Sequence, residues 1–205
     1  MSTDPDRDLV RRCQVLGSQE FEAAFGELYQ RYRDKVYSLA YRIVGNPTDA
    51  LDAAQEAFVL LYQKLETFQF DSKFSSWLYR LVVNASIDQI RRSKSRRARR
   101  EVPLDPQDHL NLPDVSGPDP SASAEQKDEA DSIQRAIDRL SDKLRIVTVL
   151  RYQQNLSYEQ LAEVLGISIG TVKSRLSRAH AALAGYLGVE AGTDDAGGRE
   201  GRDAS

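Results

Sequence analysis

One stretch decides the fold of this chain: SYEQLAEVLGISIGTVKSRLSRAHAAL, residues 157–183. Ser157 can cap a short helix whose packing face includes the small Ala162. Gly166 then supplies the backbone freedom that a tight turn needs. Six residues later, Val172 is placed to pack a second helix back against the first. This spacing predicts a helix-turn-helix.

The second helix of this motif carries groups that suit DNA. Its outward face has hydroxyl, ammonium and guanidinium groups and no acid from Thr171 to Arg178. Such groups fit phosphates and purine edges in the major groove. The residues expected to contact DNA are Thr171, Lys173, Ser174, Arg175, Ser177 and Arg178. The same geometry also occurs as a plain structural corner, and the acid-free face favours DNA binding over that alternative.

Charge is distributed unevenly along the 205 residues, although the formal net charge is only −3. The segment RRSKSRRARR, residues 91–100, holds seven of the 28 basic residues and no acid. The other 195 residues hold 21 basic and 31 acidic residues, a net charge of −10. An acidic body with one basic segment repels DNA except at that segment, so we expect weak DNA affinity from the isolated chain.

Composition excludes several function classes. The chain has one cysteine, Cys13, and two histidines, His109 and His180, which are too few for a disulfide framework or a zinc site. No run of eighteen apolar residues could cross a membrane, and the charged start MSTDPDRDLVRR does not resemble a secretory signal. We therefore expect a cytoplasmic protein that is not an enzyme, is not inserted in a membrane, and uses no metal or cofactor.

The chain divides into two helical blocks at a proline-rich stretch. Five of the seven prolines fall within eighteen residues, which predicts a linker over residues 101–124. Both flanking blocks, residues 6–100 and 125–188, show the helical spacing of apolar residues. Residues 189–205 have no apolar face and are expected to be disordered. The predicted fold is all-α: two small helical domains joined by a flexible linker.

Three long helices and a shorter one are expected in the N-terminal block. An apolar stripe over residues 21–43 predicts the first long helix. Thr48 or Asp49 is expected to cap the second. The third is expected to begin near residues 75–76 and to run into the basic segment, and the shorter helix precedes all three over about residues 6–16.

Three ordered motifs connect the chain to a known family. They are DALDAAQEAF at residues 49–58, FSSWLYR at residues 74–80 with Asn84 and DQIRR at residues 88–92, and the stretch from Leu156 to Leu176. Over about residues 6–187, the chain resembles a bacterial sigma factor of the extracytoplasmic-function class, in which only sigma regions two and four remain. The resemblance implies a protein that binds core RNA polymerase, directs it to specific promoters and assists DNA melting.

The resemblance implies contacts with both large polymerase subunits. In the family, the helix matching the first motif docks on the coiled clamp helices of one subunit, and region four lies on the flap of the other. An acidic and amide face beside aliphatic residues suits a basic helix pair, although by itself such a face is more often simply solvated. The residues implied in the clamp contact are Asp49, Asp52, Gln55 and Glu56. Leu51 departs from the family, which commonly has an acid there.

The resemblance also assigns the minus-ten promoter element. Residues 68–73 match the family's specificity loop, which with the residue matching Asn84 holds an unstacked base. Aromatic rings offer stacking worth about 1–3 kcal/mol per base, and arginines can follow the phosphates. Trp77 is assigned to the bundle core ahead of a role in melting, whereas Phe68 and Phe70 are divided between core and base contact. The implied residues are Phe68, Phe70, Asp71, Lys73, Trp77, Asn84, Arg91 and Arg92.

Region four would read the minus-thirty-five element through the helix that begins near Thr171. Arg175 and Lys173 are favoured for base edges or phosphates, and Arg178 for phosphate. Family members are commonly held inactive by an anti-sigma factor that covers both domains, and the sequence leaves open whether this chain has such a partner.

Two other functions remain open on the residues alone. A stand-alone helix-turn-helix regulator would bind duplex DNA as a dimer, at half-sites about one helical turn apart. It leaves the motif from Trp77 to Arg92 unexplained. An enzyme acting on nucleic acid needs a catalytic cluster, but His109 lies in the linker and His180 has no second ligand at a metal-binding spacing.

Overall fold

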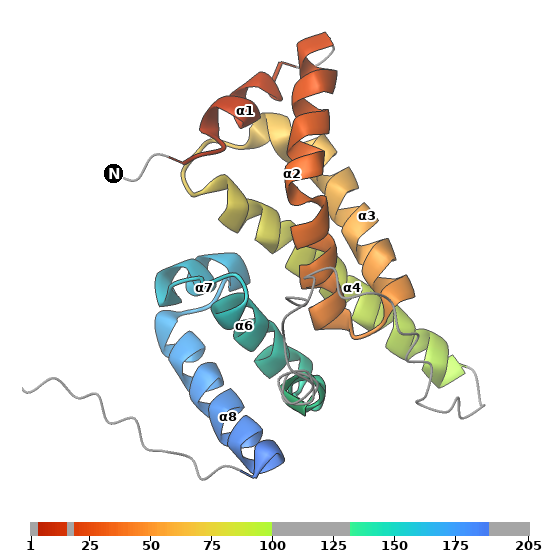
Figure 1. The fold of residues 1–205 in the computed structure, drawn as a ribbon, viewed down its shortest axis with the longest axis vertical. Helices are drawn as coiled ribbons and strands as arrows, with labels where there is room; N and C mark the ends of the chain where they lie inside the picture. Colours follow the sequence, from red (N-terminus) through yellow and green to blue (C-terminus); the bar gives the residue numbers. More distant parts are fainter. Residues whose placement is uncertain (1–3, 16–18, 100–131, 189–205) are drawn as a thin grey trace, which may run out of the picture.

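The structure, a computed structural model, describes residues 4–15, 19–99 and 132–188. Helices form all the regular structure of these residues, which confirms the all-α prediction (Figure 1). They are α1 Arg7–Arg12, α2 Gln19–Val44, α3 Pro47–Lys64, the 3-10 turn η1 Leu65–Thr67, α4 Phe74–Arg99, α6 Asp142–Tyr152, α7 Tyr158–Leu165 and α8 Ile169–Leu187. Residues 132–138 are also helical. Within the described ranges, no helix has the length and apolar character needed to cross a bilayer.

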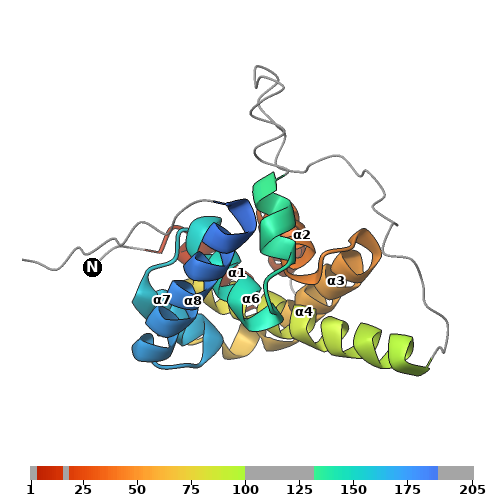
Figure 2. The same cartoon turned by 90° about the horizontal axis from the view of Figure 1, so that it is seen from below.

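The N-terminal bundle is built on one apolar stripe of α2. Leu28, Val36, Leu39 and Ile43 recur at helical spacing and are fully buried. Full burial of each such side chain contributes about 1.5–3 kcal/mol. Because α2 packs along both α3 and α4, the three helices share one core. The far end of α4 projects beyond the bundle as far as Arg99, in line with the predicted run into the basic segment (Figure 2).

The start of α3 corrects the sequence prediction. Asn46 is its cap, in place of Thr48 or Asp49, and the Asn46 side-chain oxygen accepts a hydrogen bond from the Asp49 backbone N–H at 2.8 Å. Pro47 occupies the first turn, where its fixed φ suits the helix and its missing N–H leaves no partner unsatisfied. Gly45 makes the left-handed turn, at φ +87°, that ends α2. The proline therefore moves the cap ahead of both predicted residues.

The other departures in the N-terminal block are small. The helix predicted over residues 6–16 is α1, which is shorter than predicted and covers only Arg7–Arg12. The third long helix, α4, begins at Phe74, slightly earlier than predicted, because the carboxylate of Asp4 accepts a hydrogen bond from the Phe74 N–H at 2.7 Å. The predicted linker at 101–124 and tail at 189–205 lie outside the described residues.

The helix-turn-helix has the local geometry that its sequence predicts. Ser157 and Gln160 form a reciprocal capping box at the start of α7. Gly166 ends α7 in the left-handed conformation, at φ +62°. Ser168 caps α8, and the fully buried Val172 belongs to the packed face of α8. Helix α6 packs beside both α7 and α8, so the three form one small unit.

This C-terminal unit lies against one flank of the N-terminal bundle. Helix α4 contacts α7, and α2 contacts α6; both views show the two sets of helices side by side (Figures 1 and 2). Arg145 of α6 donates a hydrogen bond to the carbonyl of Ile43, in the last turn of α2, at 3.2 Å. Lys94 of α4 forms an ion pair with Asp142 at 2.6 Å.

Candidate nucleic-acid interface

The expected DNA-reading face of α8 is accessible. Among the side chains predicted to contact DNA, Thr171 and Arg175 are half-buried. The exposed ones are Lys173, Ser174, Ser177 and Arg178. The first turn of α8 holds no acid, and the Nε of Arg178 donates to the carbonyl of Ser174 at 3.1 Å. The opposite side of α8 carries its buried residues, Val172, Leu176 and Ala179. The polar residues therefore face away from the core.

An aromatic cluster surrounds residues 68–73, which we call the recognition loop. The centroid of the Phe68 ring lies 4.9 Å from the ring centroids of both Phe70 and Trp77, and 5.9 Å from that of Phe74. Phe68 is only 6% exposed, whereas Phe70 and Trp77 are half-buried. In this conformation Phe68 is therefore a core residue, and Phe70 and Trp77 pack on the core while each keeps an open part.

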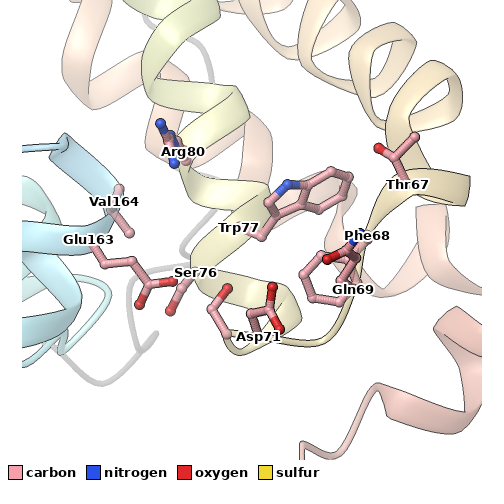
Figure 3. A pocket seen from close by; sticks show the side chains of 10 residues that line it. Thr67, Phe68, Gln69, Asp71, Ser76, Trp77, Arg80, Glu163 and Val164 are labelled. Carbon is pink, nitrogen blue, oxygen red and sulfur yellow. The ribbon is translucent and has the colours of Figure 1, made fainter.

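A cavity of about 320 Å³ opens beside this cluster (Figure 3). Three of the residues assigned to the minus-ten element line it: Phe68, Asp71 and Trp77. Phe70, Lys73 and Asn84 do not, although Asn84 was expected to help hold the unstacked base, and neither do Arg91 and Arg92. The other lining residues are Thr67, Gln69, Ser72, Ser76, Arg80, Glu163 and Val164. Because the last two belong to α7, the two helical units build this cavity together.

Several residues of the cavity wall were not predicted from the sequence, among them Ser76 and Arg80 of α4. The Ser76 residue is 2% exposed, and its hydroxyl has no hydrogen-bond partner in the described part of the chain. A buried hydroxyl without a partner is costly, so Ser76 places an unsatisfied polar group beneath this wall. Arg80 follows Trp77 by three residues and therefore shares its face of α4, a spacing that could have identified it.

The same face of α4 continues from the cavity towards the basic end. Asn84 and Arg91 follow Trp77 by seven and fourteen residues, which returns them to nearly the same side of the helix. Asn84, Arg91 and Arg92 are exposed. Arg91 forms an ion pair with Asp88 at 3.3 Å, and because both side chains are solvated this pair is weak. An exposed polar and cationic strip thus leads away from the cavity.

Asp49 differs from the other predicted polymerase contacts, because its carboxylate is bound within the bundle. Its Oδ2 accepts hydrogen bonds from Asn46 at 2.9 Å and Ser93 at 2.6 Å. Its Oδ1 accepts from Gln89 at 2.8 Å and Arg96 at 3.1 Å. Burial raises the pKa of Asp49, but these hydrogen bonds and the charge of Arg96 outweigh burial and hold the pKa below its usual value. Asp49 joins α3 to the basic end of α4. Of the four predicted polymerase contacts, Asp49 is the one that this geometry favours least.

The three remaining candidates share an open face of α3. Asp52, Gln55 and Glu56 are exposed. The large apolar residues exposed on the same helix are Leu51, Val59 and Tyr62. Apolar side chains gathered beside acids on a surface indicate a binding face. Of these three, only Leu51 was singled out from the sequence, although Val59 and Tyr62 follow it at helical spacing.

Cys13 and His180 have structural surroundings. Cys13 is fully buried, and burial raises the pKa of its thiol to about 11. The Nε2 of His180 shares a hydrogen bond with the Tyr152 hydroxyl at 2.5 Å, between α8 and α6. His109 lies outside the described residues. Among the residues that the structure does describe, no three or more potential metal ligands come together.

Comparisons with known proteins give matches in both helical blocks. Residues 28–96 match the family model of sigma-70 region 2, and residues 130–183 match that of sigma-70 region 4. The chain is 37% identical over 174 residues to the ECF RNA polymerase sigma factor SigW of Bacillus subtilis, which covers 78% of this chain and 87% of that protein. It is 34% identical to the ECF RNA polymerase sigma-E factor of Escherichia coli, over 87% of this chain and 92% of that protein.

Two solved structures share the fold. The sigma factor RpoE of Bartonella quintana, in complex with the anti-sigma factor NepR, is 22% identical with a TM-score of 0.64, over 81% of this chain and 98% of that one. CnrH, in complex with the cytosolic domain of CnrY, is 26% identical with a TM-score of 0.61, over 89% of this chain and 97% of that one.

Proposed function

The chain belongs to the extracytoplasmic-function class of the sigma-70 family, and we propose that its two helical units divide promoter recognition between them. Proteins of this family act with RNA polymerase in promoter-specific initiation of transcription and are not enzymes. We assign the minus-ten element to residues 6–100 and the minus-thirty-five element to residues 125–188.

The observation that carries this assignment is the cavity beside the aromatic cluster. Phe68 and Trp77 give it aromatic walls against which a base can stack. Arg80, which is exposed in the lining, supplies a cation for the phosphate of that base. An unstacked base of the minus-ten element is the ligand that this cavity fits. Melting is assisted because a base held there is removed from its pair.

Exposed polar and cationic side chains are the proposed contacts with the rest of each DNA element. Past the cavity, Asn84 and Arg91 lie along the path of the displaced strand towards the basic end of α4. At the upstream element, Lys173 and Arg175 of α8 read base edges in the major groove, and Arg178 holds a phosphate. Base contacts then set the sequence, and phosphate contacts set the register.

DNA enters the cavity only after α7 withdraws. Glu163 and Val164 form part of the cavity wall, and a carboxylate next to the entering phosphate is repulsive (Figure 3). We propose that polymerase separates the two units, because the clamp and the flap belong to different subunits. The open face of α3, with Asp52, Gln55 and Glu56, docks on the basic clamp helices.

Regulation by a protein partner is a further part of the proposal. Both solved neighbours are complexes, one with the anti-sigma factor NepR and one with the cytosolic domain of CnrY. We propose a comparable anti-sigma factor for this chain, and a cytoplasmic location, where RNA polymerase acts.

Reconstituted transcription tests the function. The purified chain is mixed with bacterial core RNA polymerase, and transcription is read from a promoter library with and without it. We expect stoichiometric binding and new start sites that share two sequence elements. A reversed-charge variant, D52K/E56K, should lose polymerase binding, whereas the control Glu66→Lys, on the exposed turn η1, should keep it. Paired adjacent half-sites protected without polymerase would instead show a stand-alone regulator.

A further inference from the structure

We propose that α1 and the turn that follows it position the recognition loop: Arg7 and Arg11 of α1 and Gln14 of the turn hold residues 68–73 in the conformation that receives the minus-ten base. This inference rests on the proposed minus-ten function. It concerns a part of the chain outside the family match to region 2, which begins at residue 28.

The recognition loop has a backbone conformation that needs support. Phe70 has φ +60°, in the left-handed region that residues with a Cβ atom seldom adopt. Its neighbours Gln69 and Asp71 both line the cavity, so the conformation of Phe70 decides how these two side chains are presented. A loop that relaxed at Phe70 would change the shape of the base site.

The chain around α1 holds both ends of this loop by hydrogen bonds. The side-chain amide of Gln14 donates to the carbonyls of Leu65 at 3.1 Å and Phe68 at 2.7 Å. At the other end, Oδ2 of Asp4 accepts from the Phe74 N–H at 2.7 Å. Each of these bonds joins side chains near the N-terminus to the backbone on either side of the loop.

The centre of the loop is held by two arginines. Arg7 and Arg11 lie one helical turn apart on α1, and their guanidinium carbons are 5.2 Å and 5.7 Å from the centroid of the Phe70 ring. These distances are within the range of cation–π attraction. Neither arginine forms an ion pair in the described part of the chain, whereas Arg12 of the same helix pairs with Glu27 at 3.8 Å. Arg7 and Arg11 are therefore available to act on Phe70.

Helix α1 is itself fixed on the bundle, so it can transmit this support. Leu9 and Val10 are buried in the core. Asp6, at the start of α1, accepts hydrogen bonds from Arg31 at 2.8 Å and from the Tyr32 hydroxyl at 2.5 Å, both on α2. The Arg7 and Arg11 side chains are exposed and carry none of this anchoring, so replacing them leaves the helix in place.

The test measures base discrimination by the holoenzyme. Core polymerase with the parent chain, R7A/R11A or the control Arg12→Ala is titrated with single-stranded minus-ten oligonucleotides, each intact or carrying an abasic site at one position. The position with the largest abasic effect for the parent defines the base in the cavity. We expect R7A/R11A to reduce that effect about tenfold, because two exposed cation–π contacts together bias a conformation by about this factor. Arg12→Ala should match the parent.

The alternatives have different signatures. A positioning role leaves the salt dependence of binding unchanged, and Gln14→Leu should reproduce the loss of base discrimination. If R7A/R11A instead weakens intact and abasic strands equally and lowers the salt slope by about 0.7 per lost contact, the arginines bind phosphates and the inference is wrong. Unchanged discrimination also overturns it. If the parent shows no abasic effect at any position, the proposed minus-ten function itself fails.

Discussion

Replacing Asp49 with Asn tests whether this side chain holds the bundle together. Its carboxylate accepts hydrogen bonds from four side chains, two at each oxygen. An amide of the same shape has one acceptor oxygen and one NH2 group. Whichever way the amide turns, two of the four donors then face another donor.

The size of the effect follows from these contacts. A hydrogen bond to a charged acceptor contributes about 1.5–3 kcal/mol. The Ser93 hydroxyl can rotate to accept from the amide, and the Arg96 side chain is 59% exposed, so solvent screens its contact. We therefore expect Asp49→Asn to lower the free energy of unfolding by about 2 kcal/mol at neutral pH, about the value of one such bond.

The cost depends on pH in a direction set by the lowered pKa of Asp49. A carboxyl group whose pKa is lower in the folded than in the unfolded protein stabilises the fold above its unfolded pKa, which is about 4. That contribution is lost as the pH falls through the folded pKa. The difference between parent and variant should thus be constant above about pH 5 and shrink below about pH 4.

Urea unfolding followed by circular dichroism measures this difference at neutral and acidic pH. The control is Asp52→Asn, because Asp52 is exposed and accepts from Gln89 at 3.1 Å. We expect it to cost less than about 0.5 kcal/mol. The reasoning is refuted if Asp49→Asn costs no more than the control, or if its cost is the same at acidic pH.

Three further predictions concern other parts of the chain. Gly166→Ala should lower the free energy of unfolding by about 1 kcal/mol through backbone strain alone, since no described atom beyond the adjacent backbone lies within 4 Å of the added Cβ. Thermal unfolding measures this loss, and an unchanged midpoint would contradict it. Arg175→Ala should weaken holoenzyme binding only at the upstream element, whereas neutralising the arginines of residues 96–100 should weaken binding to all sequences and flatten its salt dependence. Binding titrations at several salt concentrations separate the two effects. Equal salt slopes for the parent and the neutralised variant would contradict the prediction for residues 96–100. Cys13 should resist iodoacetamide near pH 8 until the protein unfolds, because its pKa of about 11 leaves little thiolate; rapid labelling of the folded protein would contradict this.

Features encoded by neighbouring residues could be predicted from the sequence. The apolar stripe of α2, the capping box at Ser157 and the left-handed Gly166 each depend on residues within one or two helical turns. The continuous α4, which carries Trp77 and the basic end on one helix, follows from the same kind of pattern. The resemblance to sigma factors then supplied the roles of the two units.

Features that depend on contacts distant in sequence could not be predicted. Asp49 looks like any exposed acid of a helix, and its partner Gln89 lies 40 positions away. Gln14 meets the Phe68 carbonyl across 54 positions. No periodicity encodes which side chains meet in this way. The Ser76 hydroxyl, which finds no partner among the described residues, could not be predicted for the same reason, because α7 completes the cavity wall to which Ser76 belongs.

The last turn of α2 is completed from outside its own unit. Carbonyls at the end of a helix lack partners within it, and Arg145, 102 positions later, donates to the carbonyl of Ile43. The same turn leads directly into Asn46, the cap of α3. When the two helical units separate, water replaces Arg145 as the hydrogen-bond donor to that carbonyl. By thermodynamic linkage, a partner that binds α3 and rigidifies the junction between α2 and α3 therefore changes the free energy of separating the units. In the proposed mechanism, docking on α3 and access to the cavity would then be coupled equilibria, although no residue belongs to both surfaces.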